Sequence, residues 1–279
     1  MPSFGCTHLQ INQVGFKGEI VAFAIGNTAI NQSVTTTTGT VTISVSAGSV
    51  LLIDAVATAI NADGSATVVT SVTSAHLTFS QRSAHTRHDS VGDTLFVRGE
   101  RWWAYSSGAL TSEVVTVVFT RAPDDVTNVD HLILATECQG ITPNPASPWD
   151  GNASIPNYND GQGNVPSTKS PGITTNFSQS VGLIVAYSAG VTVGTPTVPG
   201  TWTQDNAAEG ITNLLPRCFV YHQVFNVQQS NASWASTGID ASEWNWISDA
   251  FTGGTLVASG TGGGSFMSIS RVRDGGFQW

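Results

Sequence analysis

Apolar and polar side chains alternate with a period of two along much of this chain. In Val41–Val45, for example, three apolar residues alternate with Thr42 and Ser44. Such alternation predicts a β-strand with one buried and one exposed face. Continuous apolar runs, such as Val50–Val56 and Val181–Tyr187, predict strands that are buried on both faces. No helical spacing of apolar residues persists over three turns, so the pattern predicts an all-β protein.

Further strands are expected between these segments, separated by turns rich in Gly, Asn and Ser. They are Ile20–Ile25, Thr67–Val72, His76–Phe79, Thr94–Val97, Arg101–Tyr105, Ser112–Thr120, His131–Thr136, Ile173–Phe177 and Arg217–Val227. A short loop containing Gly108 joins Arg101–Tyr105 to Ser112–Thr120, and we expect a hairpin there. The polar segment Ser80–Gly92 is expected to be a loop. Trp244–Phe251 fits a strand and a short helix equally well.

Two stretches interrupt the succession of strands. Residues 141–172 contain six prolines among Asn, Asp and Gly, too many for a central strand, so we expect a long surface excursion. Residues 252–265 are Gly-rich and precede a short tail. The predicted organisation is an N-terminal arm (1–14), one jelly-roll-like antiparallel β-sandwich (15–251), and a Gly-rich linker with a C-terminal arm (252–279).

The composition restricts the classes of partner. Charged residues make up 10% of the chain, against about 25% in an ordinary soluble domain. The net charge is −9, and the ten basic residues are scattered, which argues against nucleic acid as a partner. No apolar run approaches the roughly 20 residues of a membrane-spanning helix. The first residues lack the features of a secretory signal.

The three cysteines indicate the compartment in which the chain folds. Cys6, Cys138 and Cys218 are widely spaced, which fits neither a disulfide framework nor a zinc site. Cys138 and Cys218 lie in strand-like runs and are expected to be buried free thiols. The surface composition is typical of extracellular β-proteins, yet no export signal is evident. A particle that assembles in a bacterial cytoplasm and is released by lysis would satisfy both observations.

The succession of strand-like segments resembles β-sandwich structural proteins of bacteriophage virions. The segments that carry the resemblance are Val41–Ala47, Val50–Val56, Val69–Phe79, Glu100–Ser106, Val114–Thr120 and Ile133–Gly140. The resemblance covers roughly residues 15–251 and rests on rhythm and composition. It implies a virion role, such as capsid decoration, a head fibre or tail attachment, and it implies no particular catalytic residue.

Strong catalytic motifs are absent from the sequence, and no cofactor is expected. Six acidic residues are the candidates for a glycosidase pair: Glu100, Glu113, Glu137, Glu209, Asp240 and Glu243. Among them, Glu100 and Glu113 flank the predicted hairpin and are the best candidates to face each other. Without a shared acidic cluster on one strand, we expect a non-enzymatic protein.

Two polar segments carry side chains that bind metal ions in other proteins. His85, His88, Asp89 and Asp93 could bind a divalent ion. However, the nearby Arg82 and Arg87 disfavour a cation and could pair with the acids instead. Asn157–Asn164 offers oxygen ligands for calcium, although Asn, Asp and Gly are also the residues that ordinary turns require. We expect no metal at either segment.

Eight tryptophans in a weakly charged β-protein raise the possibility of glycan binding. Trp149, Trp202 and Trp234 lie in loop-like segments and are the candidate glycan contacts. Trp102 and Trp103 are adjacent in a predicted strand, so their side chains must point to opposite faces. The alternative is that these large aromatic side chains fill the core or protein interfaces.

The C-terminal arm is the candidate interface with another subunit. Its apolar and basic side chains are Phe266, Ile269, Arg271, Arg273, Phe277 and Trp279. They could bury against a neighbouring subunit's sheet edge or fold back on their own domain.

The function expected from these features is that of a non-enzymatic virion structural protein of a bacteriophage. It would serve in capsid decoration or cementing, or as a head- or tail-attached component. Its partners would be copies of itself and major capsid or tail proteins, and it would be located in the virion after assembly in the host cytoplasm. The alternative is a glycan-binding adhesin of a virion, with a host surface glycan as its ligand.

Overall fold

The computed structural model describes most of the chain between residues 23 and 252. The described ranges are 23–32, 34–60, 67–88, 95–122, 129–141, 147–162, 168–177, 180–189, 201–209, 216–231, 235–236 and 243–252. No helix occurs in these residues, so none of them forms a membrane-spanning helix. All strand pairs are antiparallel, which confirms the predicted all-β class. Of the predicted arms, 1–14 and 252–279, only Thr252 lies in the described residues, where it ends β15.

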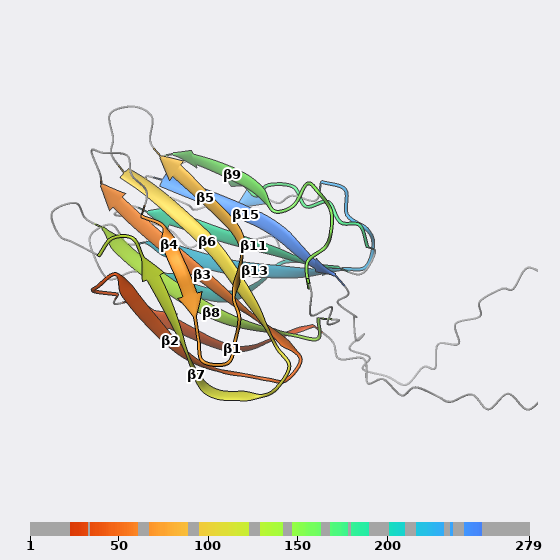
Figure 1. Ribbon diagram of the computed structural model, residues 1–279. Helices are drawn as coiled ribbons and strands as arrows, with labels where there is room; N and C mark the ends of the chain where they lie inside the picture. The colour runs from red at the N-terminus through yellow and green to blue at the C-terminus, as the bar shows by residue number, and fades with distance from the viewer. Residues whose placement is uncertain are drawn as a thin grey trace, which may run out of the picture.

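Three sheets are stacked as layers (Figure 1). The middle sheet contains, in spatial order, β1 (Ala24–Asn31), β8 (Asp130–Gln139), β3 (Ser49–Ile60), β6 (Leu95–Ser106) and β5 (Ser80–His88). The small sheet contains β2 (Thr38–Val45), β7 (Leu110–Phe119) and β4 (Val69–Thr73). The C-terminal sheet contains β12 (Thr203–Glu209), β13 (Arg217–Phe225), β11 (Ser180–Ala189), β15 (Glu243–Thr252) and β9 (Asn157–Gln162). A short ladder joins β10 (Thr168–Lys169) to β14 (Ala235–Ser236).

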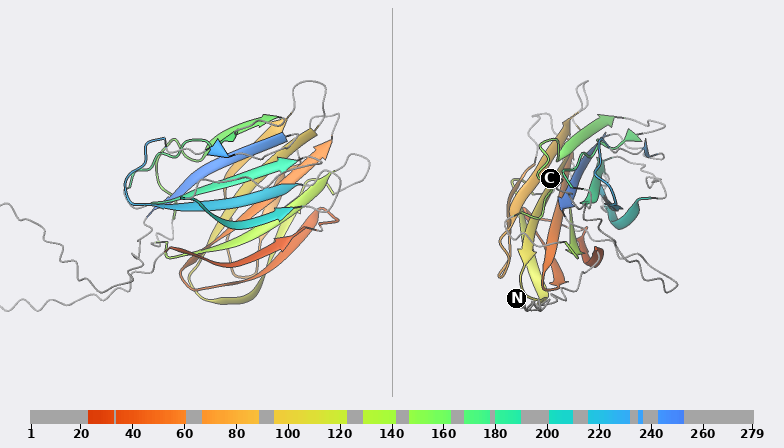
Figure 2. Two further views of the ribbon diagram at one scale, coloured as in Figure 1. Left: turned by 180° about the vertical axis from the view of Figure 1, so that it is seen from behind. Right: turned by 90° about the vertical axis from the view of Figure 1, so that its right-hand side faces the viewer.

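The first two sheets follow most of the strand order of a jelly roll. The pairs β1–β8, β2–β7 and β3–β6 are those formed when an antiparallel ribbon of eight strands folds over itself. β5 departs from this order, because it pairs with β6 in the middle sheet rather than with β4 in the small sheet. The antiparallel sandwich is therefore confirmed, whereas a complete jelly roll stays a prediction. The C-terminal sheet adds a third layer that was not predicted, seen from another side in Figure 2.

The small and middle sheets enclose an apolar core. Val41, Ile43 and Val45 of β2 point into it, as their alternation predicted, and Leu51 and Ile53 of β3 meet them from the other side. Each of these five side chains is at most 3% exposed. This interface is held together by buried apolar area, which contributes roughly 25 cal/mol per Å² removed from water.

The opposite face of the middle sheet packs on the C-terminal sheet. Val50 and Leu52 of β3 point to this side, so β3 is buried on both faces, as its continuous apolar run predicted. Cys138 and Cys218 lie in this interface and are free thiols, which confirms the prediction made for them.

Some strands were predicted wrongly. β6 and β7 do not form a hairpin, because β6 pairs with β3 and β5 while β7 pairs with β2 and β4. The short connection between them instead crosses from one sheet to the other. β5 replaces the loop expected at its position, and β9 lies inside the expected excursion. His76–Phe79 and Ile173–Phe177 form no strand, β12 was missed, and Trp244–Phe251 belongs to strand β15.

Register irregularities are confined to pairs that involve an edge strand. β1, β4, β5 and β12 each carry one extra residue relative to their neighbour, and in the β2–β7 pair the extra residue is on β7. The interior pairs β3–β6, β3–β8, β11–β13 and β11–β15 are regular. Bulges at sheet edges hinder pairing with other chains. Among the edge strands of the three large sheets, β9 is the exception, because its pairing with β15 is regular.

Candidate functional site

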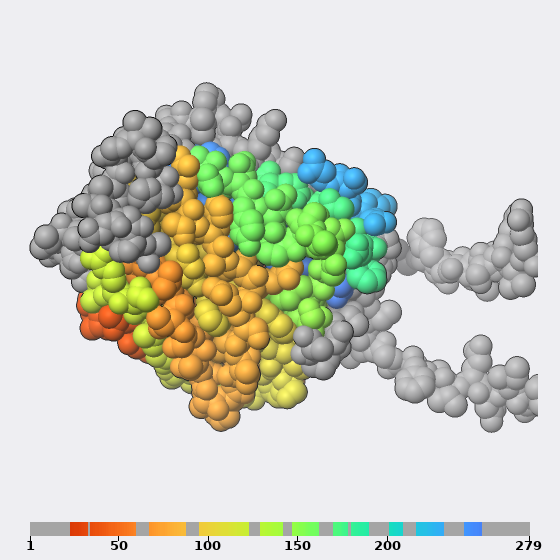
Figure 3. Space-filling model, turned by 45° about the horizontal axis from the view of Figure 1, so that its top comes forward, coloured from red at the N-terminus to blue at the C-terminus, as the bar shows by residue number. Residues whose placement is uncertain are grey.

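A cluster of charged side chains joins the middle and C-terminal sheets where β5 approaches β9 and β15. We call this cluster the seam, and Figure 3 shows the surface along which the orange segment containing β5 adjoins the green segment containing β9. The seam consists of Arg82, His85 and Arg87 of β5, Tyr158 and Asp160 of β9, and Glu243 and Asp249 of β15.

Arg82 and Asp249 form the most enclosed contact of the seam. Arg82 Nε and Nη2 each donate a hydrogen bond of 2.7 Å to the Asp249 carboxylate, which is fully buried. The Arg82 guanidinium also lies 4.8 Å from the centroid of the Trp149 ring. Burial raises the pKa of Asp249, and the arginine opposes that shift. The bidentate geometry makes this a strong charge-assisted pair between two sheets.

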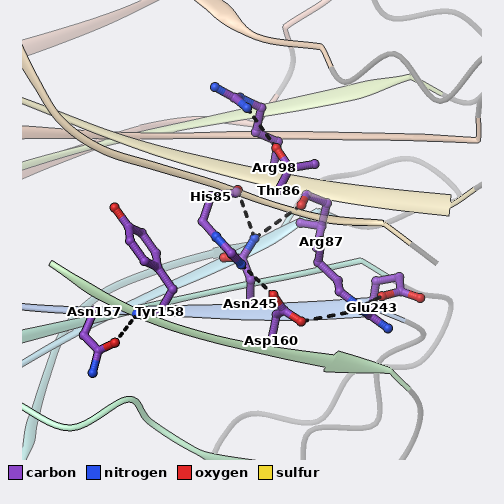
Figure 4. A network of polar contacts seen from close by, with 10 residues as sticks. His85, Thr86, Arg87, Arg98, Asn157, Tyr158, Asp160, Glu243 and Asn245 are labelled. Atoms are coloured by element: carbon purple, nitrogen blue, oxygen red, sulfur yellow. Dashed lines mark hydrogen bonds and ion pairs between the residues drawn. The ribbon is translucent and has the colours of Figure 1, made fainter. Parts of the chain in front are cut away.

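His85 and Arg87 share the carboxylate of Asp160 (Figure 4). His85 Nε2 lies 2.6 Å from Asp160 Oδ2, and Arg87 Nη1 lies 3.5 Å from Asp160 Oδ1. Arg87 Nε also donates a 2.9 Å hydrogen bond to Glu243. The His85 ring stacks on Tyr158, with ring centroids 4.8 Å apart. Burial raises the pKa of Tyr158, although 37% of this residue is exposed.

The contacts of the seam join β5 to β9 and β15. A histidine held by a carboxylate is the base and its orienting group in many hydrolases, which also require a hydroxyl or thiol beside the histidine. In the part of the chain that the structure describes, the His85 side chain contacts Asp160 and Tyr158. Its contacts therefore position two strands against each other.

A second polar group lies inside the same interface, away from the surface. Arg101 donates hydrogen bonds of 2.8 and 2.9 Å to Asp54 of the neighbouring strand, and the Tyr187 hydroxyl of β11 donates one of 2.9 Å. All three residues are fully buried. Burial opposes a charged Arg101, but Asp54 outweighs it and raises the pKa of Arg101. Burial and Asp54 together raise the pKa of Tyr187. This triad fixes the C-terminal sheet on the middle sheet.

The candidate glycan contacts do not present their rings at the surface. Trp149 is 6% exposed and stacks on Phe251, and Trp202 is 8% exposed and packs edge-on against Phe225. This corrects the sequence-based proposal: both side chains fill the core, because a loop-like sequence says nothing of the direction in which a ring points. Trp234 lies outside the described residues, as do the arm residues Phe266, Ile269, Arg271, Arg273, Phe277 and Trp279.

Glu100 and Glu113 lie in different sheets, on β6 and β7, and each carboxylate has its own hydrogen-bond partners. Glu100 accepts hydrogen bonds from Val69 N, Gln81 and Arg98. Glu113 instead accepts one of 3.0 Å from the backbone of His76 and lies 2.7 Å from the ring of the same residue. Both carboxylates are thus occupied by neighbouring strands and loops.

Glu137 has a structural role near the start of β1. Its carboxylate accepts hydrogen bonds from the backbone N–H groups of Asn27 and Ser46. Burial alone would raise the pKa of Glu137, but these hydrogen bonds outweigh burial and lower the pKa to about 2. Glu243 belongs to the seam, whereas Asp240 and the side chain of Glu209 lie outside the description.

Neither candidate metal segment forms a metal-binding group in the described residues, which contain no cluster of three or more His, Cys, Asp or Glu side chains with suitable geometry. His85 faces Asp160, while the side chain of His88 and residues Asp89 and Asp93 lie outside the description. The first part of the candidate calcium segment, Asn157–Gln162, forms β9.

The seam was missed because its acids are distant in sequence. His85 and Asp160 are 75 residues apart, and Arg82 and Asp249 are 167 apart. One signal was present: His85 and Arg87 are two residues apart, which places them on one face of a strand.

Comparisons with protein-family models, with curated protein sequences and with solved structures found no match to the chain.

Proposed function

We propose that this chain is a non-enzymatic structural protein of a bacteriophage virion, in capsid decoration or cementing or as a head- or tail-attached component. It acts by presenting rigid surfaces and sheet edges to copies of itself and to other virion proteins. The sequence resemblance and the scarcity of charged residues support the bacteriophage assignment.

The proposal rests on the contacts that the charged side chains form. Arg82, Arg87 and Arg101 each bond to a carboxylate on another strand, two of them across the boundary between sheets. The carboxylates of Glu100 and Glu113 also accept hydrogen bonds from backbone N–H groups of other segments. Charges arranged like this favour a stiff particle component over the convergent groups of an active site.

Association of the purified full chain tests the proposal. We expect sedimentation velocity to show defined oligomers that form reversibly with increasing concentration, and reading frames for capsid, portal or tail proteins beside the gene. A chain that stays monomeric up to millimolar concentration would overturn the proposal, and hydrolysis of a polysaccharide would replace it with an enzymatic role.

Phe177 favours glycan binding as a second candidate function. This residue is 52% exposed, and its backbone carbonyl accepts hydrogen bonds from Thr175 Oγ1 and Ser180 Oγ. The amide side chains of Asn152 and Asn176 are joined by a 3.0 Å hydrogen bond in the adjacent exposed segment. An exposed aromatic ring next in the chain to a hydrogen-bonded pair of amide groups is an arrangement suited to a sugar ring.

A glycan array probed with Phe177→Ala tests this candidate. Val227 is 63% exposed and lies in a neighbouring loop that is joined to Thr175 by backbone hydrogen bonding, so Val227→Ala is the matched control. We expect the phenylalanine variant to lose binding to any glycan that the unaltered chain and the valine variant retain. Equal binding by both variants would rule out Phe177 as a contact.

A further inference from the structure

We propose that the open edge of β9 accepts the C-terminal arm of a second copy of this chain, with residues 266–273 adding as a strand to the C-terminal sheet. This inference rests on the proposed function, which requires association between copies. It specifies the acceptor edge and the segment that occupies it. Strand addition of this kind derives its affinity from backbone hydrogen bonds.

The other edge strands of the three large sheets are protected against such pairing. β1, β4, β5 and β12 are interrupted by an extra residue. In β2, the backbone carbonyls of Thr40 and Ser44 accept hydrogen bonds from the side chains of Asn31 and Asn27 on β1. Glu100 accepts the N–H of Val69 at the start of β4. Bulges and side-chain caps are the usual means of blocking an edge.

β9 has no extra residue, although the Asn157 side chain accepts the N–H of Tyr158 on its far side. Its residues pair with β15 in continuous register from Asn157↔Ser248 to Gln162↔Glu243, and no other strand of the described chain pairs with its far side. The N–H of Tyr158 donates to the Asn157 side chain, which indicates that Tyr158 directs its backbone away from β15. Alternate residues of an antiparallel strand direct their backbone groups to the same side. The N–H and C=O of Asp160 therefore face the open edge.

The arm has the length, pattern and charge of a suitable occupant. Twenty-seven residues follow Thr252, and in residues 266–273 Met267, Ile269, Arg271 and Arg273 alternate with a second set that is mostly small or apolar. Two arginines and one aspartate give residues 253–279 a formal charge of +1, so the total of −9 leaves −10 to residues 1–252. A basic arm is thus attracted to an acidic body at long range.

Strand direction favours an arm from another copy. β9 runs antiparallel to β15, so an arm that turned back directly after Thr252 would run parallel to β9. All the described pairs are antiparallel, and an antiparallel pair is slightly more stable per residue than a parallel one. An arm of the same copy would first have to run back along the sheet through residues 253–265 before it could pair antiparallel with β9, whereas an arm from a second copy can approach β9 in that direction directly.

Full-length variants with one defective partner each test the inference. Asp160→Pro removes the outward N–H, and Asp160→Ala is the matched control because it removes the same carboxylate and keeps the N–H. Ile269→Pro disrupts the arm. We expect the two proline variants to associate at least about tenfold more weakly than Asp160→Ala in sedimentation experiments. An equimolar mixture of the two proline variants should regain association, since each supplies what the other lacks.

The outcomes separate this inference from the proposed function. If the chain associates and both substitutions of Asp160 behave alike, the β9 acceptor is wrong while the structural role stands. If the unaltered chain never associates, both fail. Hydrogen exchange on the unaltered chain provides a test that needs no substitution. Protection of residues 157–162 that increases with protein concentration supports the inference, and protection that is independent of concentration overturns it in favour of an arm folded on its own sheet.

Discussion

The two faces of the middle sheet are both buried, but different forces hold their neighbours. Towards the small sheet, β3 presents Leu51, Ile53, Ala55 and Ala57, and the contacts are apolar across the whole centre. Towards the C-terminal sheet, the same strand presents Asp54 among apolar residues, and two separate apolar clusters flank it. The centre of one interface thus depends on apolar area, with a polar contact from Glu100 to Val69 beside it, whereas the other interface has directional polar contacts at its centre.

This difference indicates that polar contacts of defined geometry, together with apolar burial, position the C-terminal sheet on the middle sheet. A purely apolar interface tolerates small shifts between sheets, whereas a bidentate ion pair has one favourable arrangement. Buried ion pairs contribute little net stability compared with well-packed apolar residues, but removing one partner is costly. We therefore expect the polar interface to respond more sharply than the apolar one to single substitutions.

The largest effect is expected for Asp54→Ala. It leaves the fully buried Arg101 without its counter-charge, which should lower the free energy of unfolding by about 3–5 kcal/mol in urea denaturation. The double variant Asp54→Leu with Arg101→Leu is the control, and it should recover most of the loss because no charge remains buried. A double variant as unstable as the single one would show that the pair itself stabilises the fold.

Ile53 is next to Asp54 in β3, and Ile53→Ala tests the apolar interface between the middle sheet and the small sheet. Ile53 is fully buried, and its truncation should cost roughly 3 kcal/mol through lost burial and a residual cavity. Ile53→Val should cost about 1 kcal/mol. If the measured loss for the alanine variant exceeded that for Asp54→Ala, the expected ranking of the two interfaces would be reversed.

Gly99→Ala should cost about 2 kcal/mol by forcing the C-terminal sheet outward. A Cβ at Gly99 would lie 2.0 Å from the Tyr187 ring, which packs against the glycine. At Gly108 a Cβ would meet nothing within 4 Å, so Gly108→Ala is the control and should change stability little. Equal thermal midpoints for the two variants would contradict the close approach of Tyr187.

His131→Phe should give the smallest change at neutral pH, a gain of about 1 kcal/mol. His131 stacks on Phe119, is fully buried, and has no hydrogen-bond partner for either ring nitrogen in the described structure. Burial lowers the pKa of His131 to about 3, so the unfolded chain binds the proton first. The unaltered protein should thus lose stability as the pH falls below about 6.5 towards 3. Urea midpoints at pH 7 and pH 4.5 should show the gain of the variant increasing at the lower pH.

The sequence predicted those parts of the fold in which burial is expressed as apolar periodicity. β2, β3 and β7 were found in this way, because alternating or continuous apolar residues indicate which faces avoid water. β5 could not be found by the same rule, since the side chains that it directs inward include Arg82, His85 and Arg87. Their burial depends on carboxylates from strands much later in the chain.

Local pattern also fails to show which sheet a strand joins. The connection after Ser106 is equally compatible with a hairpin and with a crossing between sheets, and the apolar faces of β6 and β7 point into the same core in either arrangement. The rings of Trp149 and Trp202 were misjudged for a related reason, since the direction of a side chain in an irregular segment is set by tertiary contacts.

The positions of Cys138 and Cys218 allow both thiols to report separation of the C-terminal sheet from the middle sheet. Both thiols face the interface between the middle and C-terminal sheets, and burial raises the pKa of each, so neither reacts while the layers stay together. Their alkylation rates measure how often the third layer lifts away, independently of events at the small sheet. Alkylation of these two thiols would therefore increase in any process that separates the two sheets.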